Sequence, residues 1–434
     1  MRDVILIAGF AVALPMCFWR PWFGLLVWSF FGYMNPHRLT WGVAYDLPFV
    51  AVAAAATLAG LIFGRERMRF PVSAVTVVWI LFVLWTIVTT QFAVAPDDAS
   101  YELSRMLKVQ AMIAVTLLIM GSRQRLEILV ATIALSIGFY GLKGGIFTVA
   151  TGGAYRVWGP YGSFIEGNNE IAFALLIVMP LLKYMFDMAD NKWIRRGLLA
   201  TMVFSAFAIV GSYSRGAFLG GAAMAFAMWL KSPRKLRFAV PAVLLCVLVV
   251  GFMPDSWTNR METIQDYEQD DSAMGRINAW HFAVNLAADR PITGGGFGTF
   301  TPALFQKYAP SPDDFHDAHS IFFEVLAEQG YVGLVLFVSL GLLAFRTGSW
   351  VTRAARDRPD LLWVTRLARM TQVSLIGYTV GGLFLGLAYF DLPYHLMAIL
   401  VLLKQHTREQ LAGDVPERQP AAAGEHQGAA GAAP

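Results

Sequence analysis

A histidine stands between a long polar segment and an apolar run, in the sequence Asp317-Ala318-His319-Ser320. The apolar run can enter a membrane as a helix, so the imidazole of His319 is predicted to lie at a membrane–water boundary. A group that titrates near neutral pH is costly to keep there and is usually functional, as a proton acceptor or donor. The alternative is a helix N-terminal histidine that is hydrogen-bonded to Asp317. His316 competes for any role given to His319.

Several basic residues lie at or near the predicted outer ends of the apolar runs, where a membrane helix does not need them. Arg215 lies in a very short turn between two apolar runs, Arg156 and Arg276 lie in polar segments, and Lys143 is predicted near the outer end of its own run. Arginine binds phosphate oxygens through paired hydrogen bonds, so such a cluster would neutralise a lipid diphosphate at the membrane surface. The alternatives are a snorkelling Arg215 that reaches lipid headgroups and solvated loop residues at Arg276 and Arg156.

Acidic residues near these positions could support the same chemistry. Glu324 stands one turn after Ser320, where it could orient His319 or pair with an arginine. Asp391 and His395 precede the last apolar run, where they could reach the same cavity or anchor the turn.

The elements that must position these residues are membrane helices. The chain has 434 residues, of which 56% are hydrophobic and 15% charged, and its mean hydropathy is +0.53. Soluble domains are less apolar and carry about 25% charged residues. An all-α polytopic membrane protein is therefore predicted. The sequence pI of about 9.0 is no sign of nucleic-acid binding, because loops on the inner side of membranes are basic anyway.

About twelve spans have the required length. They are predicted near residues 4–19, 47–64, 72–93, 104–120, 127–150, 170–187, 197–212, 216–230, 238–253, 320–346, 371–388 and 394–404. The apolar stretch 22–34 is short and is predicted as a re-entrant or interfacial piece. With the amino terminus inside, every second loop is basic, whereas Arg20, Arg38, Arg105, Arg156 and Arg215 fall on the sparser outer loops.

The predicted organisation has four parts. Residues 1–253 carry nine spans, and residues 254–319 form a large outer loop with room for two or three short helices. Residues 320–404 carry the last three spans. Residues 405–434, rich in Ala, Gly, Glu, Gln and Pro, are predicted to be a disordered cytoplasmic tail, because this composition cannot bury a core.

Several motifs are missing from the sequence. No Walker loop is present, so ATP is not expected as a fuel. No HExxH motif or Cys/His cluster suggests zinc, and no Asp-x-Asp pair suggests a metal ion on a nucleotide sugar. We therefore expect neither metal nor cofactor. The glycine-rich stretch 294–298 follows no strand and is predicted as a turn between loop helices, not as a phosphate cradle.

Taken together, these residues resemble the O-antigen ligase family. The similarity rests on the turn at residues 213–216, the stretch Gly275-Arg276-Ile277-Asn278-Ala279-Trp280, the glycine-rich stretch 294–298 and the entry of the helix at residues 319–330. It extends to the span plan with a large outer loop before span ten. Ser320 stands where the family commonly has Asn, which indicates a subgroup such as the ligases found alongside exosortase systems.

The resemblance implies a fold like that of GT-C membrane glycosyltransferases and metal-independent, inverting transfer at the periplasmic face of the bacterial inner membrane. The donor would be a glycan on undecaprenyl diphosphate and the acceptor a sugar hydroxyl of lipid A–core. His319 would be the general base, Arg215 and Arg276 would bind the diphosphate, and Arg156 and Lys143 are weaker candidates. A polymerase and a protein O-oligosaccharyltransferase remain alternatives. A transporter is less favoured, because the polar residues gather at one face.

Overall fold

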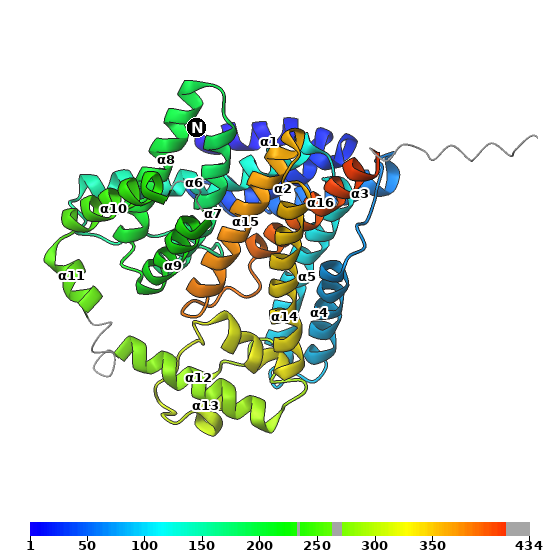
Figure 1. Ribbon diagram of the computed structural model, residues 1–434. Helices are drawn as coiled ribbons and strands as arrows, with labels where there is room; N and C mark the ends of the chain where they lie inside the picture. The colour runs from blue at the N-terminus through cyan, green and yellow to red at the C-terminus, as the bar shows by residue number, and fades with distance from the viewer. Residues whose placement is uncertain (232–234, 263–270, 414–434) are drawn as a thin grey trace, which may run out of the picture.

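The computed structural model describes residues 1–231, 235–262 and 271–413, and these parts of the chain form helices and no strand (Figure 1). The α-helices are α1 (Arg2–Trp19), α2 (Pro21–Met34), α3 (Phe49–Phe63), α4 (Ala74–Thr90), α5 (Pro96–Ile119), α6 (Arg123–Ala150), α7 (Asn168–Met188), α8 (Lys192–Gly211), α9 (Arg215–Lys231), α10 (Lys235–Phe252), α11 (Asp255–Glu262), α12 (Asp271–Asp289), α13 (Pro302–Tyr308), α14 (Ile321–Ala354), α15 (Leu362–Gly381) and α16 (Asp391–Gly413). Short 3-10 turns occur at η1 (Pro36–Leu39), η2 (Val43–Tyr45) and η4 (Pro359–Leu361).

Each of the predicted apolar spans overlaps one helix, which confirms the all-helical prediction. The span predicted at 371–388 is displaced, because α15 ends at Gly381 and the residues that follow form a loop. Within the described residues, α1, α6, α7, α8 and α14 are long and apolar enough to cross a membrane. The helical residues 239–252 and α11 make a sixth candidate if this pair, bent by 111°, is one span. The chain therefore has the character of a multi-pass membrane protein, and the number of about twelve spans stays a prediction.

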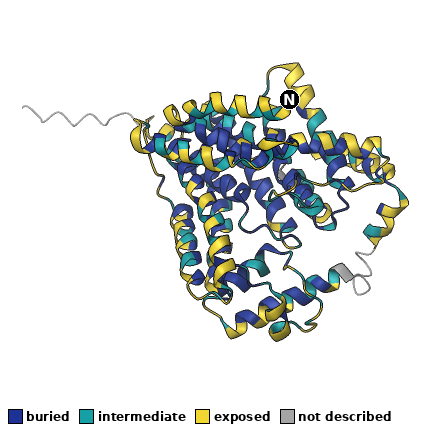
Figure 2. Cartoon of the chain, turned by 180° about the vertical axis from the view of Figure 1, so that it is seen from behind, coloured by how far each residue is buried: buried dark blue, intermediate teal, exposed yellow. Residues whose placement is uncertain are grey.

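The bundle has a buried centre (Figure 2), and many large hydrophobic side chains lie on its outer surface. Most of α7 is buried, and so are the first turns of α16. In contrast, α1 and α10 expose large apolar side chains such as Val4, Val12 and Val247. An apolar surface of this extent is unusual for a soluble protein and fits contact with lipid.

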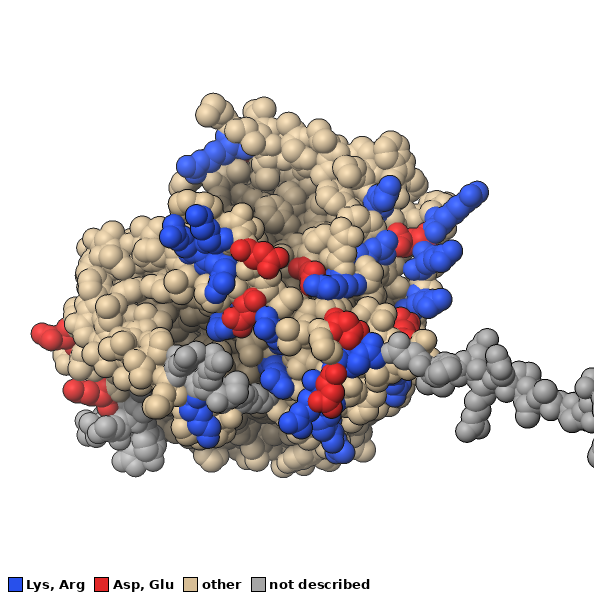
Figure 3. Space-filling view, turned by 45° about the horizontal axis from the view of Figure 1, so that its top comes forward, with Lys and Arg blue, Asp and Glu red and all other residues tan. Residues whose placement is uncertain are grey.

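One face of the bundle, here named the basic end, gathers loops that the sequence places inside, together with Arg20, which the sequence places on an outer loop. It comprises residues 20, 65–69, 121–125, 187–195, 350–366 and 405–410. Nη1 of Arg366 donates to the carbonyl of Asp187 (3.1 Å), and the guanidinium of Arg123 lies 5.2 Å from the ring centre of Trp363. Figure 3 shows Lys and Arg side chains gathered on this face near the point where α16 ends.

The prediction for residues 22–34 is wrong. These residues form α2, which begins beside the basic end at Arg20 and finishes at the opposite end. There the guanidinium of Arg38 packs on Gly162, and Nη1 of Arg2 donates to the carbonyl of Leu39 (3.3 Å). A 14-residue helix extends only about 21 Å, but α1, α3 and α6 pack around it. Arg20 and Arg38 therefore lie at opposite ends of the bundle, and the amino terminus lies with Arg38.

The predicted start of the disordered tail, residue 405, is also wrong. The helix α16 continues past Lys404 to Gly413, with His406 in ring contact with Trp363 (5.2 Å). Residues 405–413 are therefore helical, not disordered, and the rest of the predicted tail lies outside the described residues. The composition rule failed here because its signal comes mainly from the residues beyond Gly413.

The large loop before α14 contains α11, α12 and α13, of which α12 and α13 lie together below the bundle in Figure 1. The helix α14 rises from this layer and is broken at Gly330, where φ is 67° and ψ is −172°. A side chain at this position would collide with the carbonyl oxygens of Pro291 and Ile292. The break leaves a short first part of α14, residues 321–329, beside α12.

Candidate functional site

His319 lies in the short connection before α14. Its backbone is left-handed, with φ of 42°, which is uncommon for a residue with a side chain. The indole N–H of Trp280 donates to the carbonyl of Ala318 (2.8 Å), and the N–H of Ile321 donates to the carbonyl of Gly382 (2.8 Å). The position of His319 is therefore fixed by α12 on one side and by the loop after α15 on the other.

The polar segment before this histidine is held along α12. Nδ2 of Asn278 donates to the carbonyls of Ser311 and Asp314 (2.8 Å each), and its Oδ1 accepts from the N–H of Ser311 (2.9 Å). The ring of His316 rests directly on Gly275, where a Cβ would collide with it. Nε2 of His316 is 2.8 Å from Oδ1 of Asp314. This arrangement occupies His316 structurally and leaves His319 as the candidate base.

The surroundings of His319 favour its neutral form. Burial lowers the pKa of His319 below its usual value, and the positive charge of Arg276 lowers this pKa further. Asp317 opposes both effects, and His316 adds to the lowering. A neutral imidazole at neutral pH can accept a proton, which is the requirement for a general base.

Glu170, in the first turn of α7, is a member of this group that the sequence prediction missed. It interacts electrostatically with Arg276 and with Asp317, and its carboxylate lies over Gly167. An acidic residue in the first turn of a helix is ordinary, because it complements the helix dipole, so its type gave no signal. Its importance here comes only from the neighbours that α12 and the segment before α14 bring to it.

The turn that carries Arg215 lies against the same part of α7. Nδ2 of Asn168, in the first turn of α7 with Glu170, donates to the carbonyl of Ser212 (2.7 Å). Tyr213 holds the turn in a left-handed conformation with φ of 62°, after which α9 begins at Arg215. The side chain of Arg215 is half-buried. The chain therefore places Arg215 at the end of the bundle that carries Glu170.

The loop between α15 and α16 connects this turn to the histidine. A Cβ on Gly216 would lie 3.1 Å from Cβ of Phe384, and the ring centre of Phe384 is 6.4 Å from that of Trp280. Gly386 contacts the backbone of His319, with a Cβ there 3.7 Å from the Cα. We name this region the site end, defined by Glu170, Arg215, Arg276, Asp317 and His319.

The two acidic residues predicted to support the site, Glu324 and Asp391, lie in different surroundings. Oε2 of Glu324 accepts a hydrogen bond from the N–H of Ala388 (3.2 Å). The same oxygen and the backbone of His319 both lie next to Gly386. Asp391 is buried and hydrogen-bonded to Tyr33, whose hydroxyl is 2.8 Å from Nδ1 of the buried His395. Asp391 and His395 therefore anchor α16 to α2. Within the described parts of the chain, no three His, Cys, Asp or Glu side chains are grouped to hold a metal ion.

The two weaker basic candidates, Arg156 and Lys143, lie in different places. The guanidinium of Arg156 lies 5.9 Å from the ring centre of Tyr213, so Arg156 joins the Arg215 turn. Lys143 lies on the exposed face of α6, whereas the neighbouring Gly141 and Gly144 face α8. Lys143 is thus not brought to the site end.

The glycine-rich stretch 294–298 caps the first part of α14. The N–H of Gly295 donates to the carbonyl of Ala327 (2.8 Å), and the N–H of Gly296 donates to that of Glu328 (2.9 Å). These carbonyls would otherwise lack partners where the helix breaks. The turn therefore lies between α12 and α13, as predicted, and the N–H groups of all four of its glycines already have partners within the protein.

Comparison with known proteins gives two family matches. Residues 200–338 match the family described as O-Antigen ligase, and residues 1–189 match a family of unknown function (DUF5935). The first match includes Arg215, Arg276 and His319. No curated protein shows significant similarity to the chain.

Proposed function

Because residues 200–338 are a domain of the O-antigen ligase family, we propose that this protein is an O-antigen ligase. It moves a glycan from undecaprenyl diphosphate to a sugar hydroxyl of lipid A–core, at the periplasmic face of the bacterial inner membrane. The observation that supports the proposal is that Arg276 interacts electrostatically with His319 and that the Arg215 turn lies at the same end of an apolar helix bundle. The residues come from three separate segments.

His319 is the general base. Its imidazole removes the proton from the acceptor hydroxyl while that oxygen forms a bond to the anomeric carbon. In the same step the bond between this carbon and the diphosphate oxygen breaks, and the electron pair leaves with undecaprenyl diphosphate. A single displacement of this kind inverts the anomeric centre. The lowered pKa of His319 keeps the imidazole neutral and ready for this step.

Arg215 and Arg276 bind the diphosphate. Each guanidinium can hold two phosphate oxygens and stabilise the negative charge that develops on the leaving group. Arg156 assists from beside Tyr213. Glu170 and Asp317 set the local charge around Arg276, so that an incoming diphosphate meets a positive group whose surroundings are already arranged. Lys143 is omitted, because it faces outward from α6.

The test is transfer by the purified protein in detergent, without added ATP or metal. Undecaprenyl-diphosphate glycan and lipid A–core are supplied, and products are separated on a gel. We expect a ladder on lipid A–core. Longer undecaprenyl-linked glycan without attachment to lipid A would establish a polymerase instead. Glycan on an added protein acceptor alone would establish an O-oligosaccharyltransferase, and no product of any kind would contradict the proposed transfer.

A further inference from the structure

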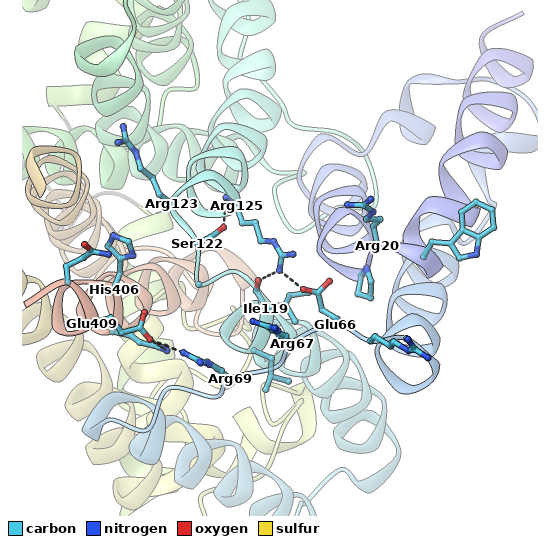
Figure 4. Close-up of a pocket in the computed structure, with 18 residues that line it drawn as sticks. Arg20, Glu66, Arg67, Arg69, Ile119, Ser122, Arg123, Arg125, His406 and Glu409 are labelled. Atoms are coloured by element: carbon cyan, nitrogen blue, oxygen red, sulfur yellow. Dashed lines mark hydrogen bonds and ion pairs between the residues drawn. The ribbon is translucent and has the colours of Figure 1, made fainter. Parts of the chain in front are cut away.

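A cavity of about 750 Å³ opens at the basic end (Figure 4). It is far along the bundle from His319, which precedes the start of α14, whereas the end of α14 lies beside α16 at the basic end. The cavity lies where the loop after α3, the start of α6 and the end of α16 meet. Six arginines and two glutamates contribute to its wall: Arg20, Arg65, Arg67, Arg69, Arg123, Arg125, Glu66 and Glu409. Like charges gathered around one cavity repel each other, so a bound anion would lower the energy of this arrangement.

Part of the cavity wall is fixed by hydrogen bonds. Nη1 of Arg125 donates to Oε1 of Glu66 and to the carbonyl of Ile119 (2.7 Å each). The guanidinium of Arg125 also lies 5.5 Å from the ring centre of Trp22. The N-terminus of α6 opens here after its cap, Ser122, and the positive end of the helix dipole adds to the field of the arginines.

The remaining arginines have fewer partners. Arg69 lies 3.7 Å from Glu409, and Arg123 pairs with Glu127 (3.0 Å) on its own helix. In the parts of the chain that the structure describes, Arg20, Arg65 and Arg67 form no ion pair. Their guanidinium groups can therefore bind phosphate oxygens without first breaking an ion pair.

An apolar groove adjoins this cavity. It has a volume of about 530 Å³ and runs between α1 and α3. Its wall consists of Leu14, Pro15, Phe18, Trp19, Val52, Ala55, Ala56 and Ala59. Trp19 contributes to both the groove and the cavity. From Val52 to Ala59 the groove follows about 10 Å of helix, enough to hold part of an acyl chain.

We propose that the basic end binds an anionic glycerophospholipid, with the phosphate headgroup in the arginine-lined cavity and an acyl chain in the α1–α3 groove. Charge selects the headgroup, and the adjoining groove distinguishes a lipid from a soluble phosphate. Such a lipid would connect the loop after α3 to α6 and α16. This site is separate from the site end, so it does not depend on the proposed transfer reaction.

The experiment measures lipid binding by native mass spectrometry of the full-length, delipidated protein in detergent. The probes are phosphatidylglycerol, phosphatidylcholine and glycerol phosphate. We expect phosphatidylglycerol to bind saturably and the other two to bind weakly. The double variant Arg65→Gln/Arg67→Gln should raise the Kd for phosphatidylglycerol about tenfold or more, since each lost phosphate contact is charge-assisted. Ala55→Phe, which fills the groove, should also weaken binding.

Two matched controls decide the result. Arg353→Gln/Arg356→Gln removes the same charge from exposed residues of the basic end outside the cavity, and Ala51→Phe adds the same ring to an exposed position of α3 outside the groove. Both should leave the Kd unchanged. Equal weakening by the control charges would show general electrostatic attraction and overturn the site. Equal binding of glycerol phosphate would show a soluble phosphate site, and unchanged binding in the cavity variant would also overturn the proposal. Binding is the readout, so failure here is distinct from failure of transfer.

Discussion

Arginines gather at both ends of the bundle, but the side chains that surround them differ between the two ends. At the site end, Arg215 and Arg276 are half-buried, and Arg276 acts on the titratable His319 and on Glu170. At the basic end the arginines come from loops and helix ends, and most are exposed around an open cavity. Its histidine, His406, packs in ring contact with Trp363.

The comparison shows that residue type alone does not identify a reaction site. An arginine next to a carboxylate and an imidazole shifts the protonation of that imidazole, which is a condition for catalysis. Arginines around a cavity with an apolar groove provide charge and shape, which suit binding. The following predictions test this difference, beginning with the change that should have the largest effect.

Removal of the proposed base, His319, should give the largest difference between the two ends. His319→Ala should lower kcat for transfer by about 10²-fold to 10⁴-fold, the usual contribution of general base catalysis. His316→Ala is the matched control, because His316 rests on Gly275 and pairs with Asp314; its effect should be much smaller. Initial rates of glycan transfer measure both. Normal transfer by His319→Ala would remove His319 from the mechanism.

Exchange of arginine for lysine should have the next largest effect, and only at the site end. Arg215→Lys and Arg276→Lys keep the charge but lose the paired hydrogen bonds that we propose these arginines make to phosphate, so kcat should fall about tenfold to a hundredfold. Arg123→Lys makes the same exchange at the basic end and should leave kcat unchanged. A similar loss in all three variants would mean that arginine acts through general stability and not through the diphosphate.

The pH profile of transfer should move in opposite directions in two variants. The charge of Arg276 lowers the pKa of His319, so Arg276→Gln should raise this pKa and shift the acid limb of kcat/KM to higher pH. Asp317 raises the same pKa, so Asp317→Asn should shift the limb to lower pH. Transfer assayed from pH 4 to 8, a range set around the ordinary histidine pKa of about 6.5, measures both shifts. Shifts in one common direction would contradict the assignment of His319 as the titrating group.

The smallest effect is expected from the basic end. Arg65→Gln/Arg67→Gln should change the initial rate of transfer by less than about twofold, because exposed charges far beyond a Debye length of about 8 Å are screened. The assay uses detergent without anionic lipid, so that loss of lipid does not enter the result. A loss as large as that of Arg215→Lys would show that the two ends are coupled.

Much of the architecture follows from the sequence. Continuous apolar runs predicted helices at every span, and cytoplasmic-type basic loops predicted a shared face, on which residues 65–69 and 121–125 indeed meet. The prediction for residues 22–34 was wrong because the length rule assumes a helix that is surrounded by lipid, whereas α2 is packed against other helices. Glu170 escaped because a first-turn carboxylate has an ordinary local explanation.

The sequence alone determined which residue types could do chemistry and which segments must be helices, since both depend on local composition and periodicity. By residue type and position in the chain, it indicates Arg215, Arg276 and His319 as candidates. Only the tertiary structure decided which candidates meet. It joins α7, α9, α12 and the start of α14 at one end, turns Lys143 outward and buries Asp391 against Tyr33. The physical reason is that electrostatic and hydrogen-bond interactions act over a few ångströms, and distances of that size between remote segments are set by helix packing.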